Sequence, residues 1–147
     1  MFERAERRYL EAAPLGRLAS TDGAGRPHVV PVCFAFVGDD IVTPIDEKPQ
    51  RASPTELRRV RDVRANARVA LVVDHYAENW GELGWVQVRG TAALVESRGD
   101  GHSAAVNALR SKYDQYESHR LEERPVIRIA PGTVRSWGSL TRPTESD

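Results

Sequence analysis

The sequence has little cysteine and no long apolar run, and these absences limit where the protein resides. Among its 147 residues there is one cysteine, Cys33, so an internal disulfide is excluded, which fits a reducing compartment. No window approaches about 18 uninterrupted apolar residues, and the opening segment MFERAERRYLEAAP has no apolar signal-peptide core. We therefore expect a cytoplasmic protein with no membrane partner, and a length typical of one domain.

Charge of one sign is not in excess, because 21 basic residues balance 21 acidic ones. This balance argues against a general nucleic-acid binder. The segment 48–68 nevertheless contains only two acidic residues, Glu56 and Asp62, against seven basic ones: Lys48, Arg51, Arg58, Arg59, Arg61, Arg64 and Arg68. It contains no aromatic residue, which a nucleic-acid-binding face would require. The segment is either a solvated helix face or a local site for phosphate or carboxylate, which arginine binds in a bidentate manner.

Several familiar chemical motifs are also absent. The sequence has no phosphate-binding GxxxxGKS/T, no GxSxG nucleophile elbow, no HExxH and no paired cysteines. We expect no metal site, because the four histidines lack ligand spacing: His28, His75, His102 and His119. Cys33 stands within a predicted strand with no base beside it, which favours a small buried residue over a nucleophile.

Apolar alternation and turn residues predict a mainly antiparallel sheet. We expect strands at 16–21, 27–37, 41–46, 68–74 and 85–96, with a bulge at Gly90 in the last of these. A hairpin of 126–130 and 134–137 is expected to turn at Pro131-Gly132-Thr133. Helices are expected at 2–13, 54–66 and 100–116. This pattern indicates an α+β, mainly β barrel in one domain over 1–140, with a loose tail at 141–147.

Pro31 interrupts a segment that otherwise predicts an excellent strand. Proline has no N–H for the ladder, so it belongs at a sheet edge or a bulge, or where something other than a strand packs. It either protects an edge from aggregation or, with the arginine-rich segment, forms a groove with an anion-binding end. Trp80, Trp85 and Trp137 are either core residues or flat walls of that groove. The second interpretation predicts a planar ligand that carries a phosphate.

Three segments in this order resemble the flavin- and deazaflavin-binding split β-barrel superfamily related to pyridoxamine 5′-phosphate oxidases: GRLASTDGAGRPHVVPVCFAF, NARVALVVD and VRGTAALVE. Within that superfamily, KPQR followed by LRRVRDVRANARVALVVDHY and a downstream tryptophan is similar to the F420-dependent oxidoreductases of actinobacteria. The resemblance implies a six-stranded antiparallel split β-barrel with a few peripheral helices. It also implies a homodimer with two cofactor sites at the subunit interface.

The resemblance also implies which residues meet the cofactor. Its ring would lie against the strand at 29–34, flanked by His28, Pro31, Val32 and Cys33. Its phosphate or acidic tail would meet Lys48, Arg51, Arg58, Arg59 and Arg61. Aromatic and imidazole groups near the ring would be His75, Trp80 and Trp85. One position departs from the pattern, because Asp62 stands where relatives commonly have asparagine, and its carboxylate repels an anion unless Arg58 or Arg59 neutralises it.

The activity implied by the resemblance is hydride transfer from the reduced deazaflavin coenzyme F420 to an unsaturated small-molecule acceptor. The cofactor carries the reaction, which agrees with the absence of a catalytic triad or acid–base pair. A proton donor, if one is needed, is water, His28 or His75. The alternatives are an oxidoreductase of the same fold that binds flavin mononucleotide (FMN), and a non-catalytic carrier of either cofactor.

Overall fold

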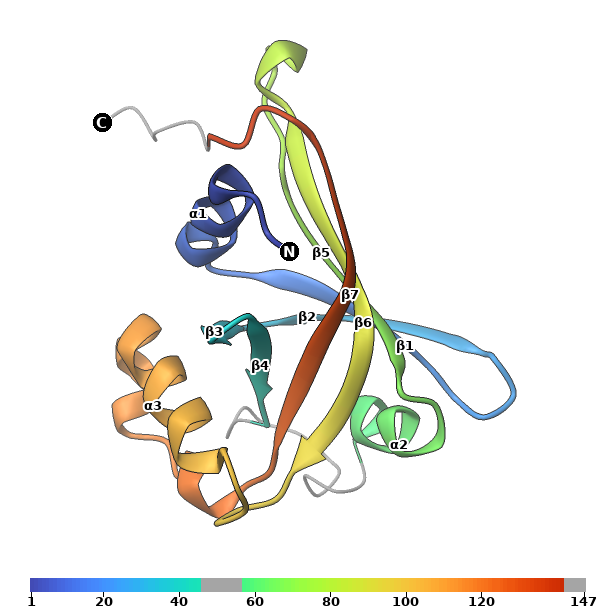
Figure 1. Ribbon diagram of the computed structural model, residues 1–147, viewed down its shortest axis with the longest axis vertical. Helices are drawn as coiled ribbons and strands as arrows, with labels where there is room; N and C mark the ends of the chain where they lie inside the picture. Colours follow the sequence, from blue (N-terminus) through green and yellow to red (C-terminus); the bar gives the residue numbers. More distant parts are fainter. Residues whose placement is uncertain (46–56, 142–147) are drawn as a thin grey trace.

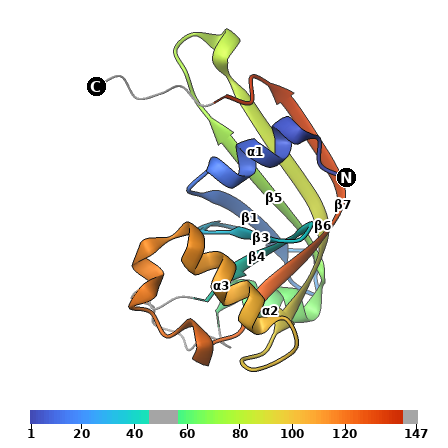
Figure 2. The same ribbon diagram turned by 60° about the vertical axis from the view of Figure 1, so that its left-hand side comes forward.

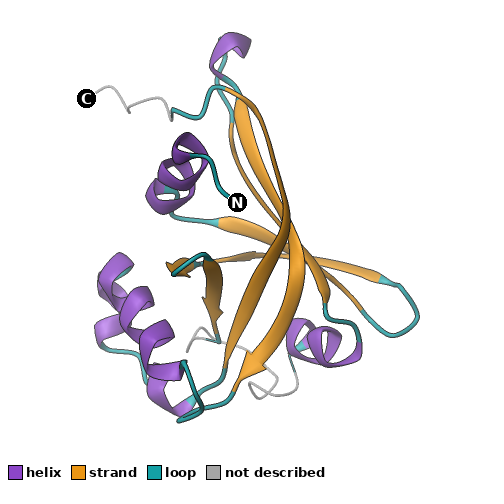
Figure 3. Cartoon of the chain, in the orientation of Figure 1, coloured by secondary structure: helices purple, strands orange, loops and turns teal. Residues whose placement is uncertain are grey.

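The computed structural model describes residues 1–45 and 57–141. Over these residues the chain forms a seven-stranded antiparallel sheet with three α-helices, as Figures 1 and 3 show. The strands are β1 (Gly16–Thr21), β2 (Pro27–Val32), β3 (Ala35–Val37), β4 (Asp40–Pro44), β5 (Arg68–His75), β6 (Gly84–Val95) and β7 (Val126–Gly138). The helices are α1 (Arg4–Ala12), α2 (Arg58–Ala65) and α3 (His102–Lys112), with short 3-10 turns η1 (Trp80–Glu82), η2 (Asp114–Glu117) and η3 (Leu121–Glu123). The prediction of an α+β, mainly β split barrel is confirmed.

The strand order is β2-β1-β5-β6-β7-β4-β3, which leaves an open sheet with β2 and β3 at its two edges. The sequence predicts one strand at 27–37, but the chain leaves the ladder at Cys33 and Phe34. Before that corner β2 pairs with β1, and after it β3 pairs with β4. The segment expected to form one strand therefore forms two, β2 at one edge of the sheet and β3 at the other. This division gives the described residues seven strands rather than six. Among the described strands β2 pairs with β1 alone, so Pro31 lies at a sheet edge, which is one of the positions that the sequence leaves open for it.

The predicted C-terminal hairpin is wrong, because β7 is one continuous strand. The twelve residues of β6 are long enough to pair with both halves of β7, so the residues expected to turn remain in the ladder. Gly90 lies opposite Pro131, but the preceding residue, Arg89, lies opposite Thr133. Gly132 of β7 is therefore an extra residue with no partner in β6. The irregularity expected at Gly90 is confirmed, and the proline is tolerated because it lies at a bulge.

All three predicted helices differ from the observed ones at their ends, and the helix expected at 2–13 is α1 over Arg4–Ala12. The helix expected at 54–66 is α2, which begins only at Arg58, because Leu57 before it has an extended backbone, and which ends at Ala65; residues 54–56 lie outside the described residues. The helix expected at 100–116 ends at Lys112, and η2 follows it. In Figures 1 and 2, α1 lies above β1, and α2 and α3 lie below it.

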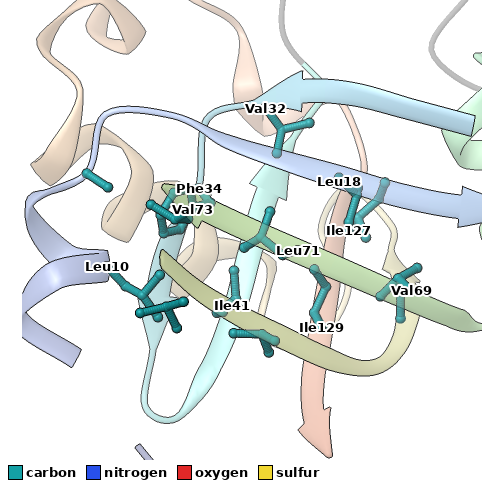
Figure 4. Close-up of a cluster of buried hydrophobic side chains, with 14 of the residues drawn as sticks. Leu10, Leu18, Val32, Phe34, Ile41, Val69, Leu71, Val73, Ile127 and Ile129 are labelled. Atoms are coloured by element: carbon teal, nitrogen blue, oxygen red, sulfur yellow. The ribbon is translucent and has the colours of Figure 1, made fainter. Parts of the chain in front are cut away.

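The helices bury the apolar side chains of the inner sheet face in two clusters. The larger cluster joins α1 and α2 to the sheet, and Figure 4 shows ten labelled members of the core: Leu10, Leu18, Val32, Phe34, Ile41, Val69, Leu71, Val73, Ile127 and Ile129. The second cluster lies between α3 and the strands β3 and β4. Because burial of apolar area is the main driving force for folding, these clusters fix the helices to one face and leave the opposite face of the sheet uncovered by them.

Tyr113, directly after α3, holds the corner between β2 and β3. The backbone N–H of Phe34 donates to the Tyr113 hydroxyl at 3.1 Å. That hydroxyl lies 3.0 Å from the Pro14 carbonyl and 3.1 Å from the Phe34 carbonyl, and its single hydrogen donates to one of them at a time. Burial raises the pKa of Tyr113 to about 12, so the hydroxyl stays protonated across the physiological range.

Tyr113→Phe is therefore expected to destabilise the protein by about 1–2 kcal/mol, because a buried Phe34 N–H loses its acceptor. Urea unfolding of the variant and the wild-type protein measures the difference. Tyr76→Phe is the matched control, since Tyr76 is 68% exposed and its hydroxyl change is expected to have no effect. An equal unfolding midpoint for Tyr113→Phe and wild type would contradict the assigned role.

Candidate functional site

The face of the sheet that points away from the helices is the first candidate surface. Strand alternation leaves apolar side chains uncovered on it, including Val29 at 60% and Trp137 at 54% exposure. The register places a row of outward residues across four neighbouring strands: Pro31, Arg17, Val72 and Gln87. Trp85 lies opposite Trp137 in an adjacent row. Exposed aromatic and apolar groups of this kind mark surfaces that bind a ligand or a partner.

A cavity of about 310 Å³ lies on this outer face beside Trp85. Its lining includes Val72, Gln87 and the ion pair between Arg17 and Asp74. The structure therefore places a flat indole, an aliphatic side chain and an amide around one hollow. Sequence analysis singled out Trp85 but missed Arg17 and Gln87. Their proximity follows from the pairing of β1, β5 and β6, which local sequence patterns do not specify.

The expected ring-flanking residues separate onto two faces. Pro31 is exposed on the outer face with Trp85, whereas Val32 points into the core and is 4% exposed. Only the backbone of Val32 is therefore open to a ligand. Because side chains alternate between the two faces along β2, His28 points to the same inner side as Val32, and it is half-buried. Cys33 is half-buried at the β2–β3 corner, beside the cluster that contains α3.

His75 joins α1 to the hairpin of β5 and β6. Its Nε2 contacts the carbonyl oxygen of Glu82, which only accepts, so Nε2 carries the hydrogen. Its Nδ1 lies 2.7 Å from the Tyr9 hydroxyl and accepts from it. Both ring nitrogens therefore have partners within the chain, and this arrangement makes His75 a structural link between two elements. Trp80, at η1 in the same hairpin, is 73% exposed and free to contact a ligand.

The described part of the arginine-rich segment forms a second candidate site, whereas Lys48 and Arg51 lie outside the described residues. Arg58 and Arg61, both on α2, line a cavity of about 460 Å³ together with Asp22, Arg26, Asp62 and Ala65. Arg59 lies between them in sequence, is half-buried and is not part of this lining. Helical geometry explains why Arg59 is not part of the lining: Arg58 and Arg61 are three positions apart and share one face of α2, whereas Arg59 points in another direction.

Asp62 is 2% exposed, and Arg58 neutralises it as one of the sequence-based alternatives requires. The Ser20 hydroxyl donates to its carboxylate at 2.8 Å, and Arg58 Nε lies 3.2 and 3.3 Å from its two oxygens. Arg58 also donates to the Arg26 carbonyl at 3.3 Å. The four-residue spacing of Arg58 and Asp62 on a predicted helix is a signal from which this pair can be predicted.

The charges around this cavity balance to a single excess positive charge, from three arginines and two aspartates. Asp22 receives hydrogen bonds from the Arg26 backbone and side chain, which lower its pKa to about 2. Arg58 pairs with Asp62, and Arg26 pairs with Asp22 at 2.7 Å. Within the described residues Arg61 is the guanidinium in this lining that forms no ion pair, so it is the group best suited to bind an external anion.

The sequence profile of the pyridoxamine 5′-phosphate oxidase family matches residues 2–138. The chain belongs to this family. A 5a,11a-dehydrotetracycline/5a,11a-dehydrooxytetracycline reductase of Streptomyces rimosus is 30% identical over 138 residues, which are 93% of this chain and 83% of the relative. The pyridoxamine 5′-phosphate oxidase family includes oxidoreductases.

Two solved structures illustrate how widely the fold of this family is used. An F420 reductase has a TM-score of 0.66 at 23% identity, with 92% of this chain and 98% of that chain covered. The haem storage protein HutZ from Vibrio cholerae has a TM-score of 0.70 at 15% identity, with 90% of each chain covered. Both matches show the fold alone. In the described part of this chain no group of three or more His, Cys, Asp or Glu is placed to hold a metal ion. No described helix is long and apolar enough to cross a membrane.

Proposed function

We propose that this member of the pyridoxamine 5′-phosphate oxidase family is a reductase that binds coenzyme F420. When bound in reduced form, this deazaflavin supplies a hydride to an unsaturated organic acceptor. The observation that carries the proposal is the α2 cavity, in which Arg61 has no ion pair within the described residues. The reductase activity of the Streptomyces relative and the F420 reductase of similar fold support the same proposal.

The chain's own residues would hold the anionic part of the cofactor and shape the space around its ring. Arg61, with Arg58 held in place by Asp62, provides donors for a phosphate or carboxylate. Lys48 and Arg51 are proposed to add positive charge from the preceding segment. Trp85, which lines the cavity on the outer face, and the exposed Pro31 and Trp80 are proposed to offer apolar surface for a planar ring.

Arg61→Ala is expected to weaken cofactor binding about tenfold or more, because a charge-assisted contact is worth ~1.5–3 kcal/mol. Arg64→Ala is the matched control: Arg64 is an exposed residue of the same helix, lies 3.6 Å from Glu96 and is not part of the cavity lining. Fluorescence or absorbance titration of each variant with coenzyme F420 measures the difference. Equal affinities for Arg61→Ala and Arg64→Ala would remove the assignment of this cavity.

A side-by-side titration with coenzyme F420 and FMN at low and moderate salt tests the cofactor. We expect coenzyme F420 to bind more tightly, with an affinity that falls as salt is added, because screening acts over ~8–10 Å at 0.10–0.15 M ionic strength. Tighter, salt-insensitive binding of FMN would favour the FMN-dependent alternative. Stopped-flow mixing of the reduced complex with quinone-like acceptors then distinguishes a reductase from a carrier, since a carrier shows no oxidation.

We also propose a homodimer that buries the outer face of the sheet, because Val29 and Trp137 leave apolar surface exposed there and the helices do not cover it. Light scattering at micromolar concentration is expected to give twice the chain mass. A variant with Val29→Glu and Trp137→Glu is expected to be monomeric, and Ser111→Glu, on exposed α3 surface, is expected to stay dimeric. A wild-type monomer that still binds cofactor would contradict the proposal.

A further inference from the structure

The α2 cavity has two walls, and one of them is the turn between β1 and β2. That turn supplies Asp22 and Arg26 to the lining, and α2 supplies the remaining residues. The Arg58 guanidinium joins the two walls, because its Nη2 donates to the Arg26 carbonyl at 3.3 Å and lies 4.0 Å from Asp22 Oδ2, while its Nε pairs with Asp62. An anion that enters this cavity therefore meets a carboxylate on each wall.

Hydrogen bonds fix the Asp22 carboxylate in its wall. Its Oδ1 accepts from the backbone N–H groups of Ala24 and Arg26, both at 2.9 Å, and its Oδ2 accepts from Arg26 Nε at 2.7 Å. These bonds stabilise the charged form, and those from Arg26 contribute most to lowering the pKa of Asp22 to about 2. Asp22 therefore stays negatively charged across the physiological range, beside any ligand that the cavity holds.

The charge of the lining limits the charge of the ligand that it suits. Three arginines and two aspartates leave one excess positive charge, and Arg61 is the lining guanidinium that forms no ion pair within the described residues. A singly charged group neutralises this excess, whereas a doubly charged group leaves a surplus negative charge next to Asp22 and Asp62. The Born cost of removing an ion from water grows with the square of its charge, so it is about fourfold larger for the dianion.

We propose that the α2 cavity selects a singly charged oxyanion, such as a phosphodiester or a carboxylate, over a doubly charged phosphate monoester, and that Asp22 sets this selectivity. The inference rests on the proposed function, which places the anionic part of the cofactor in this cavity. It adds a reason for the choice of cofactor. The phosphate of coenzyme F420 is a diester with one charge, whereas the phosphate of FMN is a monoester with a charge of about −1.5 to −2 at pH 7.

Fluorescence titration of the full chain with two ligands that share one ring tests this selectivity. The first ligand is the 5′-phosphate of the F420 chromophore, a monoester, and the second is the monomethyl ester of that phosphate, a diester. FMN and its monomethyl ester form a second pair on the flavin ring. At pH ~8 we expect the diester of a pair to bind about threefold or more tightly than the monoester, because only the monoester is doubly charged there.

The same titration at lower pH tests whether charge is the cause. The monoester gains a proton near pH ~6, so at pH ~5.5 it carries mostly one charge and the difference between the two ligands is expected to close. The diester keeps one charge over this range and has the same ring. Its affinity therefore reports any titration of the ring or of the protein itself.

Asp22→Asn keeps an oxygen that accepts from the turn and removes the charge. Removal of a charge ~6 Å away in aqueous surroundings is worth about threefold in affinity for a monoanion and about tenfold for a dianion, so the preference for the diester is expected to disappear. Asp39→Asn is the matched control, because Asp39 is an exposed aspartate that also pairs with an arginine and is absent from this lining. Both variants keep every other charge, including Lys48 and Arg51, so a change in the ratio of affinities reports the substituted carboxylate.

Equal or tighter binding of the monoester to the wild-type protein at pH ~8 would overturn the inference. So would an unchanged ratio in an Asp22→Asn variant that circular dichroism shows to be folded, or an equal change in Asp39→Asn. If Asp22→Asn does not fold, the pH comparison on the wild-type protein decides alone. A diester preference seen only in the flavin pair would overturn the F420 assignment and support the selectivity. Binding of the deazaflavin pair without preference would do the reverse, and binding of neither pair would remove both.

Discussion

The Gly90→Ala variant is expected to be about 3 kcal/mol less stable than the wild-type protein, at the upper end of overpacking effects. A Cβ at this position would lie 2.2 Å from the Ala130 carbonyl oxygen and 3.2 Å from the Pro131 Cα. Both atoms belong to the backbone of β7, so relief requires two paired strands to move apart. Gly90 is therefore expected to be irreplaceable for steric reasons alone. Urea or thermal unfolding measures the loss.

Gly132→Ala is the matched control in the same bulge. The nearest atom to a Cβ at Gly132 is the Arg89 carbonyl oxygen at 3.5 Å, which is an ordinary contact. This variant is expected to be as stable as wild type or slightly more so, because alanine lowers the entropy of the unfolded chain. If both glycine variants lost the same stability, the close approach of β6 and β7 at Gly90 would not be the cause.

Arg58→Ala is expected to destabilise the protein by about 2–3 kcal/mol, because it leaves the Asp62 carboxylate buried without its positive partner. The loss is smaller than the ~3–5 kcal/mol of a fully enclosed pair, since the Arg58 side chain is partly solvated and Ser20 still donates to Asp62. The same variant is expected to bind cofactor more weakly, because a guanidinium is removed from the α2 cavity.

The Arg58→Ala/Asp62→Asn double variant separates these two effects. An asparagine keeps the shape of Asp62 and can still accept from Ser20 without carrying a charge, so most of the lost stability is expected to return. Cofactor affinity is expected to stay low, because the guanidinium remains absent. Chemical denaturation and coenzyme titration of the four proteins complete a double-mutant cycle. Additive stability losses would show that the two residues do not interact.

Local sequence patterns predict most of the strands, because each depends on neighbours along the chain. The strand at 16–21, the arginine-bearing helix and the irregularity at Gly90 all follow from alternation, spacing or a glycine. The predicted hairpin at Pro131-Gly132-Thr133 is wrong for a non-local reason. Whether a proline and glycine turn the chain or form a bulge depends on the length of the partner strand, and β6 is long enough to hold both halves of β7 in one ladder.

The candidate sites are predictable only in part for the same reason. Arginine density indicates an anion site near α2, and the spacing of Arg58 and Asp62 indicates their pairing. The meeting of Arg17 and Gln87 at one cavity depends instead on the register of β5 with β1 and β6. A shift of one residue in that register would place one of them on the opposite face. Local sequence patterns therefore identify residue types that suit a ligand, and the sheet decides which of them meet.

The order of pairing in the sheet has a consequence for synthesis of the protein. β4 pairs with β3 on one edge and with β7 on the other, where Val42 lies opposite Arg128, so one of its two partners is translated much later. At ~5–20 residues per second, the delay is on the order of 5–15 s. The β1–β2, β3–β4 and β5–β6 pairs each join strands that are close in sequence, so they can form early. The second edge of β4, however, has no partner until β7 leaves the ribosome. The nascent chain is therefore the state most exposed to aggregation, and a chain interrupted before Val126 is expected to require a chaperone to remain in solution.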